Sequence, residues 1–323
     1  MTEWIDQKLS EFMDFNPYTP LTKGSIAKKV SMECLTPFNR KIQGYEETVF
    51  FGGSKFKNGD TLLARITPCL ENGKTAYVDF LNDEEVAFGS TEFIVLRSKE
   101  GISDSKFIYY FSISDDFRDT AIQLMSGTTG RQRVETEALK QKVFTLPPLP
   151  EQKAIAEVLS SLDDKIDLLT RQNKTLEDLA QAYFRKWFIE DASDEWEVGK
   201  LGDYIKIHDS KRVPLSKIER EKTKSGTLYP YYGAATIMDY VNDYIFDGEY
   251  ILMGEDGTVE TEDGYPVLLY ATGKFWVNNH AHVLTAKSPF NNYFIWFFLK
   301  QCNISGIVTG AVQPKINQEN LKT

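Results

Sequence analysis

The sequence lacks most of the features that mark a secreted or membrane protein. It has three cysteines, Cys34, Cys69 and Cys302, which lie too far apart for a disulfide framework or a C-x-x-C zinc site. No apolar run approaches the roughly 18 residues of a membrane span, and the opening MTEWIDQKLS has no apolar core typical of a signal peptide. These absences favour a protein of the reducing cytoplasm with no membrane span.

Positive charge is also scarce, because 37 Lys and Arg residues face 47 Asp and Glu residues, giving a net charge of −10. This balance argues against a surface coated with non-specific nucleic-acid contacts, although it does not exclude a local basic face. Segment 206–224, KIHDSKRVPLSKIEREKTK, has such a local excess, with seven basic residues and three acidic ones. Either a solvated basic loop or a nucleic-acid contact accounts for this segment.

The chain of 323 residues exceeds what one hydrophobic core usually organises, and its two halves repeat each other. The repeated segments occur in the same order with small changes in spacing, which predicts two related domains. The pairs, each with its first residue, are EWIDQKLSEF (Glu3) and EWEVGKLGDY (Glu195), NGDTLLAR (Asn58) and DGEYILMG (Asp247), FGSTEFIVL (Phe88) and VNNHAHVLT (Val277), KFIYYF (Lys106) and YFIWFF (Tyr293), and RVETEALKQ (Arg133) and KINQENLKT (Lys315).

The prolines of LPPLP, from Leu146, are followed directly by a strongly patterned segment. Pro150 fits a first helical turn, where its missing N–H costs nothing, and Glu151 favours the positive end of the helix dipole. Apolar residues then recur at alternating spacings of four and three, which is the heptad pattern of a coiled coil. Such a helix would run for about 37 residues, or roughly 55 Å. Its seam consists of Ile155, Leu159, Leu162, Ile166, Leu169, Asn173, Leu176, Ala180, Tyr183 and Trp187.

Asn173 is the strongly polar residue of this seam, and a buried Asn at such a position typically fixes register and partner number. The pattern therefore favours a specified partner helix, with a single amphipathic core helix as the alternative. The residues expected to form the helix–helix interface are Ile155, Leu159, Leu162, Ile166, Leu169, Asn173 and Leu176.

Through this helix and the tandem repeat, the whole chain resembles the specificity subunits of type I restriction-modification systems. The most specific element of the resemblance is LPPLPEQKAIAEVLSSLDDKID, from Leu146. The resemblance implies an α+β protein with two related mixed α/β target-recognition domains, at residues 1–146 and 191–323. A long, coiled-coil-forming spacer helix within 147–190 would separate them. The family's second conserved helix would follow Thr323, where the sequence ends.

The resemblance also implies a function and a set of partners. Each domain is expected to read one half of a bipartite double-stranded DNA target, and the subunit is expected to be a non-catalytic scaffold for methylation (M) and restriction (R) subunits. S-adenosylmethionine, ATP and Mg are expected on those partner subunits, and no cofactor on this chain. Because the second long helix is outside the sequence, a homodimer through the long helix is a further expectation.

Three motifs that suggest catalysis or ligand binding have simpler explanations. FNPYTP, from Phe15, lacks the second proline of an N-P-P-Y motif, and no G-x-G-x-x-G follows a strand to hold a cofactor. NGKTA, from Asn72, lacks the first glycine of a phosphate-binding loop, since Pro68 stands there. His280 and His282 could flank a metal, but alternation on a strand explains them and no thiol or carboxylate cluster lies near in sequence. We therefore expect no metal site.

Two glycine-containing loops have the composition of a DNA contact. Glycines allow close backbone approach, hydroxyls and amides bind phosphate or bases, and arginine pairs with guanine or phosphate. The alternative is a turn before a helix, with its arginines in solvent. The candidates are Gly127, Thr128, Thr129, Arg131 and Arg133 in the first half, and Thr309, Gly310, Gln313 and Lys315 in the second.

A second pair of segments supplies candidates that we expect to contact phosphates. In FFGGSKFKNGD, from Phe50, these are Lys55 and Lys57. Its expected equivalent is YPYYGAATI, from Tyr229, with Tyr231 and Tyr232, and the candidates Lys211 and Arg212 add positive charge to the second half.

Two other classes of function stay open at this point. One is a coiled-coil assembly protein whose two β-rich domains bind a protein or glycan, and the other is a methyltransferase with its own activity. Binding to DNA that weakens steeply with salt would separate the first from a DNA-reading protein. S-adenosylmethionine binding by the chain alone would indicate the second.

Overall fold

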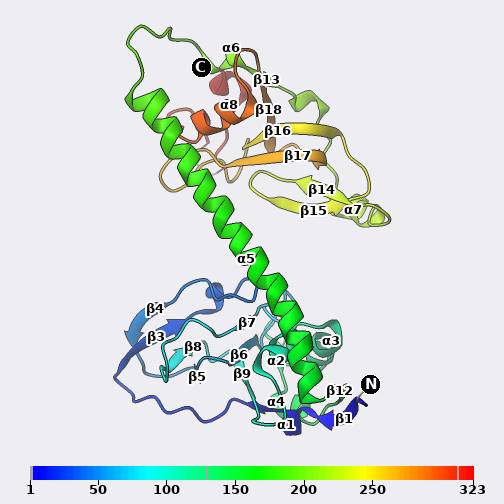
Figure 1. The fold of residues 1–323 in the computed structure, drawn as a ribbon. Helices are drawn as coiled ribbons and strands as arrows, with labels where there is room; N and C mark the ends of the chain where they lie inside the picture. Colours follow the sequence, from blue (N-terminus) through cyan, green and yellow to red (C-terminus); the bar gives the residue numbers. More distant parts are fainter. Residues whose placement is uncertain (1–2, 129, 311–312) are drawn as a thin grey trace. The chain divides into compact units, whose positions relative to one another are not determined.

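The computed structural model describes residues 3–128, 130–310 and 313–323. The chain divides into two compact units, Met1–Gln172 and Asn173–Thr323, and each is described here by itself (Figure 1). Both units contain helices and strands, which confirms the predicted α+β class. Among the described residues, no helix is both long and apolar enough to cross a membrane.

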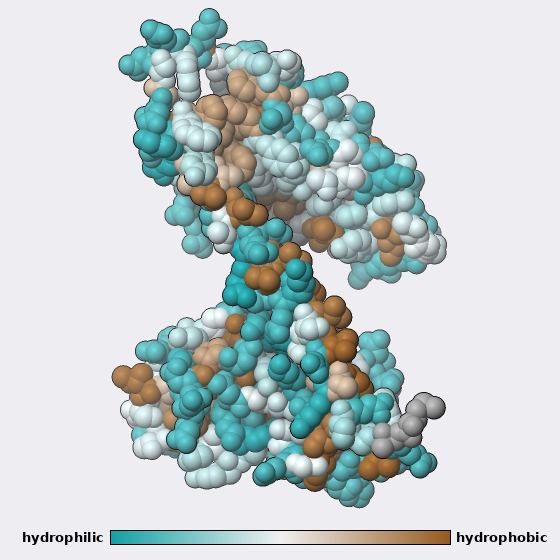
Figure 2. All heavy atoms as spheres, viewed as in Figure 1, coloured by the Kyte–Doolittle hydropathy of each residue, from teal (hydrophilic) through white to brown (hydrophobic). Residues whose placement is uncertain are grey.

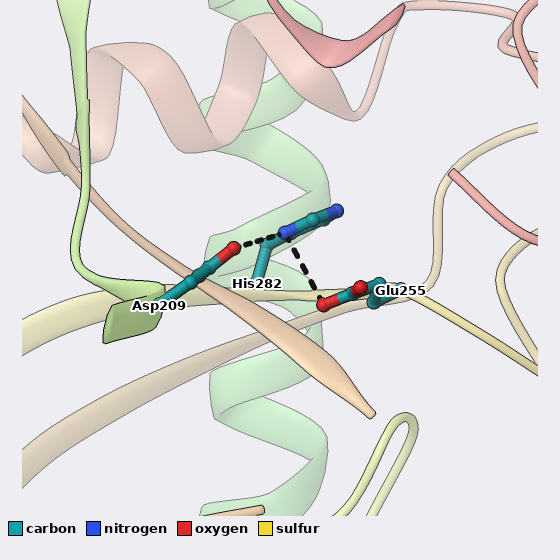
Figure 3. A group of neighbouring side chains, drawn as sticks. All are labelled: Asp209, Glu255 and His282. Atoms are coloured by element: carbon teal, nitrogen blue, oxygen red, sulfur yellow. Dashed lines mark hydrogen bonds and ion pairs between the residues drawn. The ribbon is translucent and has the colours of Figure 1, made fainter. Parts of the chain in front are cut away.

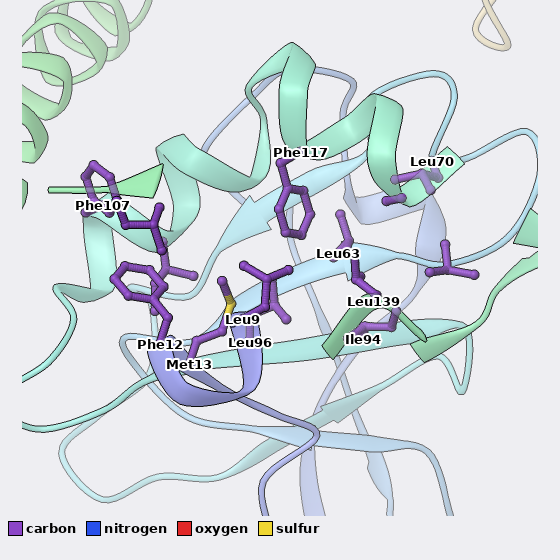
Figure 4. Packing of buried hydrophobic residues seen from close by; sticks show 14 of the residues in the cluster. Leu9, Phe12, Met13, Leu63, Leu70, Ile94, Leu96, Phe107, Phe117 and Leu139 are labelled. Atoms are coloured by element: carbon purple, nitrogen blue, oxygen red, sulfur yellow. The ribbon is translucent and has the colours of Figure 1, made fainter. Parts of the chain in front are cut away.

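The first unit contains a four-stranded sheet with the order β2-β9-β6-β7. Strand β9 is antiparallel to both β2 and β6, and its Ile94 and Leu96 share one apolar core with Leu63 of β6. Phe117 points from its helix into this core, as Figure 4 shows. The strands are β2 (Met13–Phe15), β6 (Thr61–Ala64), β7 (Thr75–Tyr77) and β9 (Phe93–Ser98), and the helices are α1 (Leu9–Phe12), α2 (Ser105–Ser112), α3 (Asp115–Gln123) and α4 (Thr136–Lys140).

A second four-stranded sheet in this unit has the order β4-β3-β8-β5 and packs over a separate core. Strand β3 runs parallel to β8, and β5 runs antiparallel to it. Two short antiparallel pairs complete the unit, β1 with β12 and β10 with β11. The bounds are β1 (Ile5–Lys8), β3 (Ile26–Val30), β4 (Glu46–Val49), β5 (Ser54–Phe56), β8 (Ala87–Gly89), β10 (Met125–Ser126), β11 (Arg133–Val134) and β12 (Val143–Leu146), with the short helix η1 (Met32–Cys34) between β3 and β4.

The second unit has one six-stranded sheet with the order β13-β18-β16-β17-β14-β15. One face of it packs on α8 and α9 around Ile251, Met253 and Leu284, and the other packs around Leu252 and Phe275. Its strands are β13 (Ile205–Ile207), β14 (Tyr229–Tyr232), β15 (Ile237–Val241), β16 (Phe246–Gly254), β17 (Leu268–Val277) and β18 (Ala281–Ala286). Its helices are α6 (Leu201–Tyr204), η3 (Asp209–Lys211), α7 (Lys217–Lys222), α8 (Asn292–Leu299) and α9 (Gln318–Leu321).

The predicted repeat is confirmed by the order of the strands. The order β2-β9-β6-β7 of the first unit recurs as β13-β18-β16-β17 in the second. The second sheet also recurs, because parallel β3 and β8 correspond to parallel β14 and β17, and antiparallel β4 corresponds to β15. The long strands β16 and β17 extend through both parts, so one sheet replaces two.

Two details of the predicted repeat were wrong. The sequence pairing of FGSTEFIVL with VNNHAHVLT aligned Leu96 with Thr285, whereas the ladders align Leu96 with Leu284. Side chains alternate between sheet faces, so a slip of one residue moves every side chain to the wrong face. The segment around Lys55 belongs to β5, which corresponds to the start of β16, and not to β14 with its YPYY sequence.

Helix α5 (Leu149–Arg185) begins at the predicted prolines and continues into the π-helical turn η2 (Lys186–Glu190). The part of the helix up to Gln172 lies in the first unit and the rest lies in the second. Gln152 fastens the helix start, since its buried amide accepts from Asp104 N at 2.9 Å and donates to Pro147 O at 2.9 Å. In the second unit Phe184 is buried against Phe294 of α8.

Candidate nucleic-acid interface

The predicted loop of the first unit is a β-hairpin between β10 and β11. Gly127 has φ of 122° and Gly130 has φ of 81°, a region of backbone conformation that side chains rarely adopt. A Cβ atom at Gly127 would also lie 3.3 Å from Arg131 O. Thr128 is exposed, and the predicted contact Thr129 lies outside the described residues. The glycines therefore set the shape of this loop.

The hairpin is attached to one edge of the four-stranded sheet, which we call the hairpin edge. Because β9 is antiparallel to β2 and β6, its start meets their ends there. Arg65 directly follows β6, and its Nη2 donates to Val134 O at 3.3 Å while Val134 N donates to Arg65 O at 2.9 Å. A bridge between Ile66 and Arg133 continues the attachment.

The two arginines of this hairpin differ in their partners. Arg133 Nη2 donates to Glu92 Oε1 at 2.7 Å, and its Nε contacts both oxygens of the same carboxylate at 3.0 Å. This fork of hydrogen bonds raises the pKa of Arg133 and holds its side chain on the protein. The Arg131 side chain is exposed, and within the described part of the chain no hydrogen bond or ion pair joins its guanidinium to another residue. Arg131 is therefore the more available cation for an external phosphate or base.

The second unit places an equivalent hairpin at the equivalent edge. Thr309 and Lys315 form a bridge that matches the Ser126–Arg133 pair of the first unit. Asp256 and Lys315 form another, which matches the Ile66–Arg133 bridge. Gly310 has φ of 90°, and a Cβ atom there would collide with Gln313 O. Gln313 and Lys315 are exposed. The predicted correspondence of the two loops is thus confirmed by their backbone pairing.

Behind the second hairpin lies a largely buried ionic cluster of Asp209, Glu255 and His282 (Figure 3). Asp209 begins η3 just after β13, Glu255 directly follows β16, and His282 lies in β18. His282 Nδ1 lies 2.6 Å from Asp209 Oδ2 and 3.6 Å from Glu255 Oε2. His282 Nε2 lies 2.9 Å from Ile316 O, at the exit of the hairpin. The cluster therefore connects the strand ends to the hairpin.

Burial by itself would raise the pKa of the Asp209 carboxyl, but its hydrogen bonds reverse this effect. Val283 N donates to its Oδ1 at 2.9 Å, and His282 and Arg212 add positive charge, so the pKa is lowered overall. In the first unit the side chain of Asn16 takes the place of this carboxylate, since its Oδ1 accepts from Val95 N at 2.9 Å. The cluster thus contains a carboxylate that stays ionised under ordinary conditions.

Arg212 was predicted to contact phosphate, but the structure corrects this interpretation. Its guanidinium is largely buried and donates to Glu255 Oε2 at 2.5 Å and to Ala281 O at 2.6 Å. Lys315 Nζ also approaches Glu255, at 3.4 Å from Oε1. The folding chain thus brings together two predicted cations that are distant in sequence, with Arg212 fixed inside and Lys315 at the surface. The neighbouring Lys211 is exposed.

The same cluster has side chains of the kinds that bind metal ions, yet its own cations already neutralise it. Arg212 pairs with both carboxylates, since its Nη2 also lies 3.5 Å from Asp209 Oδ2. Gln318 Nε2 donates to the same oxygen at 2.7 Å. Each carboxylate is therefore occupied by donors from this chain, and the geometry gives no reason to place a metal here.

Tyr231 and Tyr232 were also predicted as contacts, and the structure corrects Tyr231, while Tyr232 is partly exposed and stays a prediction. Tyr231 is buried, and its hydroxyl accepts from Leu215 N at 2.9 Å. Tyr232 packs edge-on against Phe275, and burial raises the pKa of its hydroxyl. The sequence pattern of β14 could not reveal the burial of Tyr231, because the residues that cover it, Leu215 and Arg220, lie outside the strand.

The predicted pair Lys55 and Lys57 differs in environment, although Lys57 directly follows the strand that contains Lys55. Lys55 is half-buried, and its ammonium lies 5.3 Å from the centre of the Tyr18 ring. The neighbouring Ser54 donates to Phe93 O at the start of β9, so Lys55 lies towards the hairpin edge. Lys57 is exposed in the turn before β6, at the opposite end of that strand from Arg65. Lys57 therefore does not belong with the hairpin.

The basic segment 206–224 is largely a structural loop and helix. Arg220 Nε donates to Asp239 Oδ2 at 2.9 Å and packs over the Tyr231 ring at 5.1 Å. Lys224 lies 2.9 Å from Glu221 and 3.2 Å from Asp239. Much of the local positive charge is thus neutralised by neighbouring acids within the unit.

The predicted helix–helix seam is exposed along most of its length. Leu162, Ile166 and Leu176 are 57%, 62% and 63% exposed, and Leu169 and Asn173 are exposed as well. Figure 2 shows brown apolar side chains along the exposed part of α5. The seam starts differently from the prediction, because Ile155 packs against the core of the first unit and Leu159 lines a groove beside it.

The sequence interpretation missed the acids that fix these hairpins, Glu92, Asp209 and Glu255. The sequence pairing of NGDTLLAR with DGEYILMG contributed, because it was also off by one residue and aligned Arg65 with Gly254. The ladders align Ala64 with Gly254, so Arg65 corresponds to Glu255. An alignment that kept the alternation of buried side chains would have shown this reversal of charge and indicated a compensating cation nearby.

Comparison with known proteins places the chain in a family. The family described as "Type I restriction modification DNA specificity domain" matches residues 1–178 and 193–323. The chain belongs to this family. It is 34% identical over 139 residues to a putative type I restriction enzyme specificity subunit of Haemophilus influenzae, S.HindORF215P, covering 43% of this chain and 34% of that protein.

Other relatives match longer stretches of the chain at lower identity. The putative type I restriction enzyme MjaX specificity subunit of Methanocaldococcus jannaschii is 24% identical over 82% of this chain and 66% of its own length. The type I restriction enzyme HindI specificity subunit is matched over 48% of its length, so the chain spans about a third to a half of the first relatives it matches. A crystal structure of a type I restriction-modification S subunit from M. genitalium is 19% identical, with a TM-score of 0.47 over 92% of this chain and 76% of that chain.

Proposed function

We propose that this chain recognises a bipartite double-stranded DNA sequence, with each unit reading one half through its hairpin edge. The observation that carries the proposal is the recurrence of a glycine-shaped hairpin at the same edge of each unit. Each hairpin has an exposed basic residue, which is Arg131 in the first unit and Lys315, at the position of Arg133, in the second. Such loops supply the backbone approach and positive charge that DNA contacts need. Membership of the specificity-domain family supports the same function.

The proposal extends to partners that the family suggests. The chain would act as a non-catalytic scaffold for methylation subunits and a restriction subunit, with S-adenosylmethionine, ATP and Mg bound by those subunits. The exposed seam around Leu162 and Ile166 would contact another helix, because apolar strips of this length are seldom left in water. A second copy of the chain is the occupant to test first.

The test is selection of bound sequences from a random DNA pool by the chain assembled with its methylation subunits. We expect two short specified sequences separated by an unspecified spacer. Replacing Arg131 with Ala should weaken binding by about tenfold and reduce the salt dependence by about one ion. The matched control is Lys153→Ala, which removes an exposed cation from the start of α5 and should change neither quantity. DNA binding that does not weaken with salt would argue against phosphate contacts and favour the alternative function, the binding of a protein or glycan.

A further inference from the structure

The backbone carbonyl behind each hairpin is satisfied in a different way in the two units. In the first unit Val134 O accepts from Arg65 Nη2 at 3.3 Å. In the second unit the equivalent carbonyl belongs to Ile316. Glu255 stands in the place of Arg65, because each residue directly follows its strand and its backbone carbonyl accepts a hydrogen bond from the hairpin backbone. An ionised carboxylate has no hydrogen to donate. The second hairpin therefore needs another donor.

His282 supplies that donor from the neighbouring strand, at the position that Ile94 occupies in the first unit. Its side chain is fully buried, and its Nε2 lies 2.9 Å from Ile316 O. Its Nδ1 faces the Asp209 and Glu255 carboxylates. Both ring nitrogens thus face oxygen acceptors, and both bonds form only when the ring carries a hydrogen on each nitrogen.

We propose that His282, as an imidazolium, is a positioning residue that holds the second hairpin in its DNA-reading conformation. This inference rests on the proposed function for its effect on DNA, but its structural part stands alone. Recognition by the second unit then depends on one buried histidine. The first unit uses Arg65 to satisfy the equivalent carbonyl.

The groups around His282 all belong to a single network. Two carboxylates face it, Asp209 and Glu255, and three other side-chain donors share their oxygens. These donors are Arg212 on both carboxylates, Lys315 on Glu255, and Gln318 on Asp209. The nearby His280 pairs with Asp256, and among the described residues no hydrogen bond joins it to His282. A neutral ring would turn a lone pair either to the carboxylates or to Ile316 O, so one of the two contacts would be lost.

The experiment measures amide hydrogen exchange of the two hairpins in the full chain. His282→Leu should speed exchange in peptides covering 307–318 by about tenfold, because the Ile316 carbonyl loses its donor. Peptides covering 125–134 should not change. The matched variant Arg65→Leu should give the reverse pattern, faster exchange at 125–134 and none at 307–318.

A rescue variant keeps the test meaningful if His282→Leu fails to fold. The double replacement His282→Ile with Glu255→Arg recreates the anchor of the first unit, with Ile and Arg where Ile94 and Arg65 stand. It should restore protection of the second hairpin. An unchanged second hairpin in His282→Leu, or a double variant that folds but leaves the second hairpin as unprotected as in His282→Leu, overturns the proposal.

DNA binding separates this inference from the proposed function. If the wild type selects two half-sites, His282→Leu should lose at least about tenfold in discrimination at one half-site and none at the other. Loss at both half-sites or at neither contradicts a role for His282 in positioning one hairpin. If the wild type selects no DNA, the proposed function fails, while the exchange data still decide the anchor. Stoichiometric metal in the purified chain, measured by mass spectrometry and lost in His282→Leu, would replace the hydrogen-bonded assignment with a metal site.

Discussion

Removal of Arg40 should loosen the contact between helix α5 and the first unit. Its guanidinium is buried, forms an ion pair with Asp164, and donates to Ser160 O at 3.4 Å and to Tyr110 OH at 3.4 Å. Tyr110 OH in turn donates to Asp163 Oδ2 at 2.7 Å. One side chain from the loop after η1 therefore connects α2 with two turns of α5.

The cost of Arg40→Ala can be built up from these contacts. Asp164 is 61% exposed, so its ion pair contributes only about 0.5–1 kcal/mol after solvent screening. The two long hydrogen bonds from the guanidinium to neutral oxygens add about 1 kcal/mol together. The two buried methylene groups that Ala lacks, Cγ and Cδ, add up to about 1.6 kcal/mol. We expect a loss of about 2–4 kcal/mol, and about 1–2 kcal/mol for Arg40→Met, which keeps most of the stem.

Hydrogen exchange of peptides from 149–172 and denaturant unfolding of the first unit measure this loss. Lys41→Ala is the matched control, because the neighbouring lysine forms a partly exposed pair with Asp79 and should cost less than about 1 kcal/mol. If Arg40→Ala destabilises the unit no more than Lys41→Ala does, the proposed clamp is wrong. An equal effect of Arg40→Ala and Arg40→Met would refute the contribution assigned to the stem.

The same pair gives a dependence on pH. The hydrogen bond from Arg40 lowers the pKa of the Asp164 carboxyl below its ordinary value. Its stabilisation is therefore present above the unfolded pKa of about 3.9 and is lost as the pH falls through the lower folded pKa. The difference in unfolding free energy between wild type and Arg40→Ala should shrink below about pH 4. A difference that grows on acidification would contradict the ion pair.

Three further predictions concern the seam, the helix length and the second hairpin. Replacing Leu162 and Leu169 with Glu should leave both units folded but abolish self-association in light scattering, and a wild type that stays monomeric at micromolar concentration would argue against a homodimer. Inserting four residues after Thr170 adds about 6 Å of helix and should lengthen the DNA spacer by about one or two base pairs without altering the half-sites, as sequence selection would show. Gly310→Ala should destabilise its hairpin by about 1–3 kcal/mol, because the new Cβ would collide with Gln313 O. Gly130→Ala is the control and should cost less, because Gly130 has a similar φ but open space around it. Equal effects of the two variants on hydrogen exchange of the hairpins would refute the collision.

The sequence alone determined the features that depend on local pattern. The proline-led start of α5, the heptad seam and the order of the repeated segments follow from residues close together in the chain. The two hairpins could be paired because Gly127 and Gly310 each mark a backbone turn that glycine favours. Periodicity and glycine placement are local causes, so they are readable before any fold is known.

The tertiary structure decided which of the candidate residues remain available. Arg131 and Arg212 looked alike in sequence, but Arg212 is held inside by Glu255 from another strand. Tyr231 lost its candidacy because Leu215 and Arg220 cover it. Partners of this kind come from segments far apart in the chain, and no local pattern encodes whether a cation will meet an acid within its own unit or remain free for DNA.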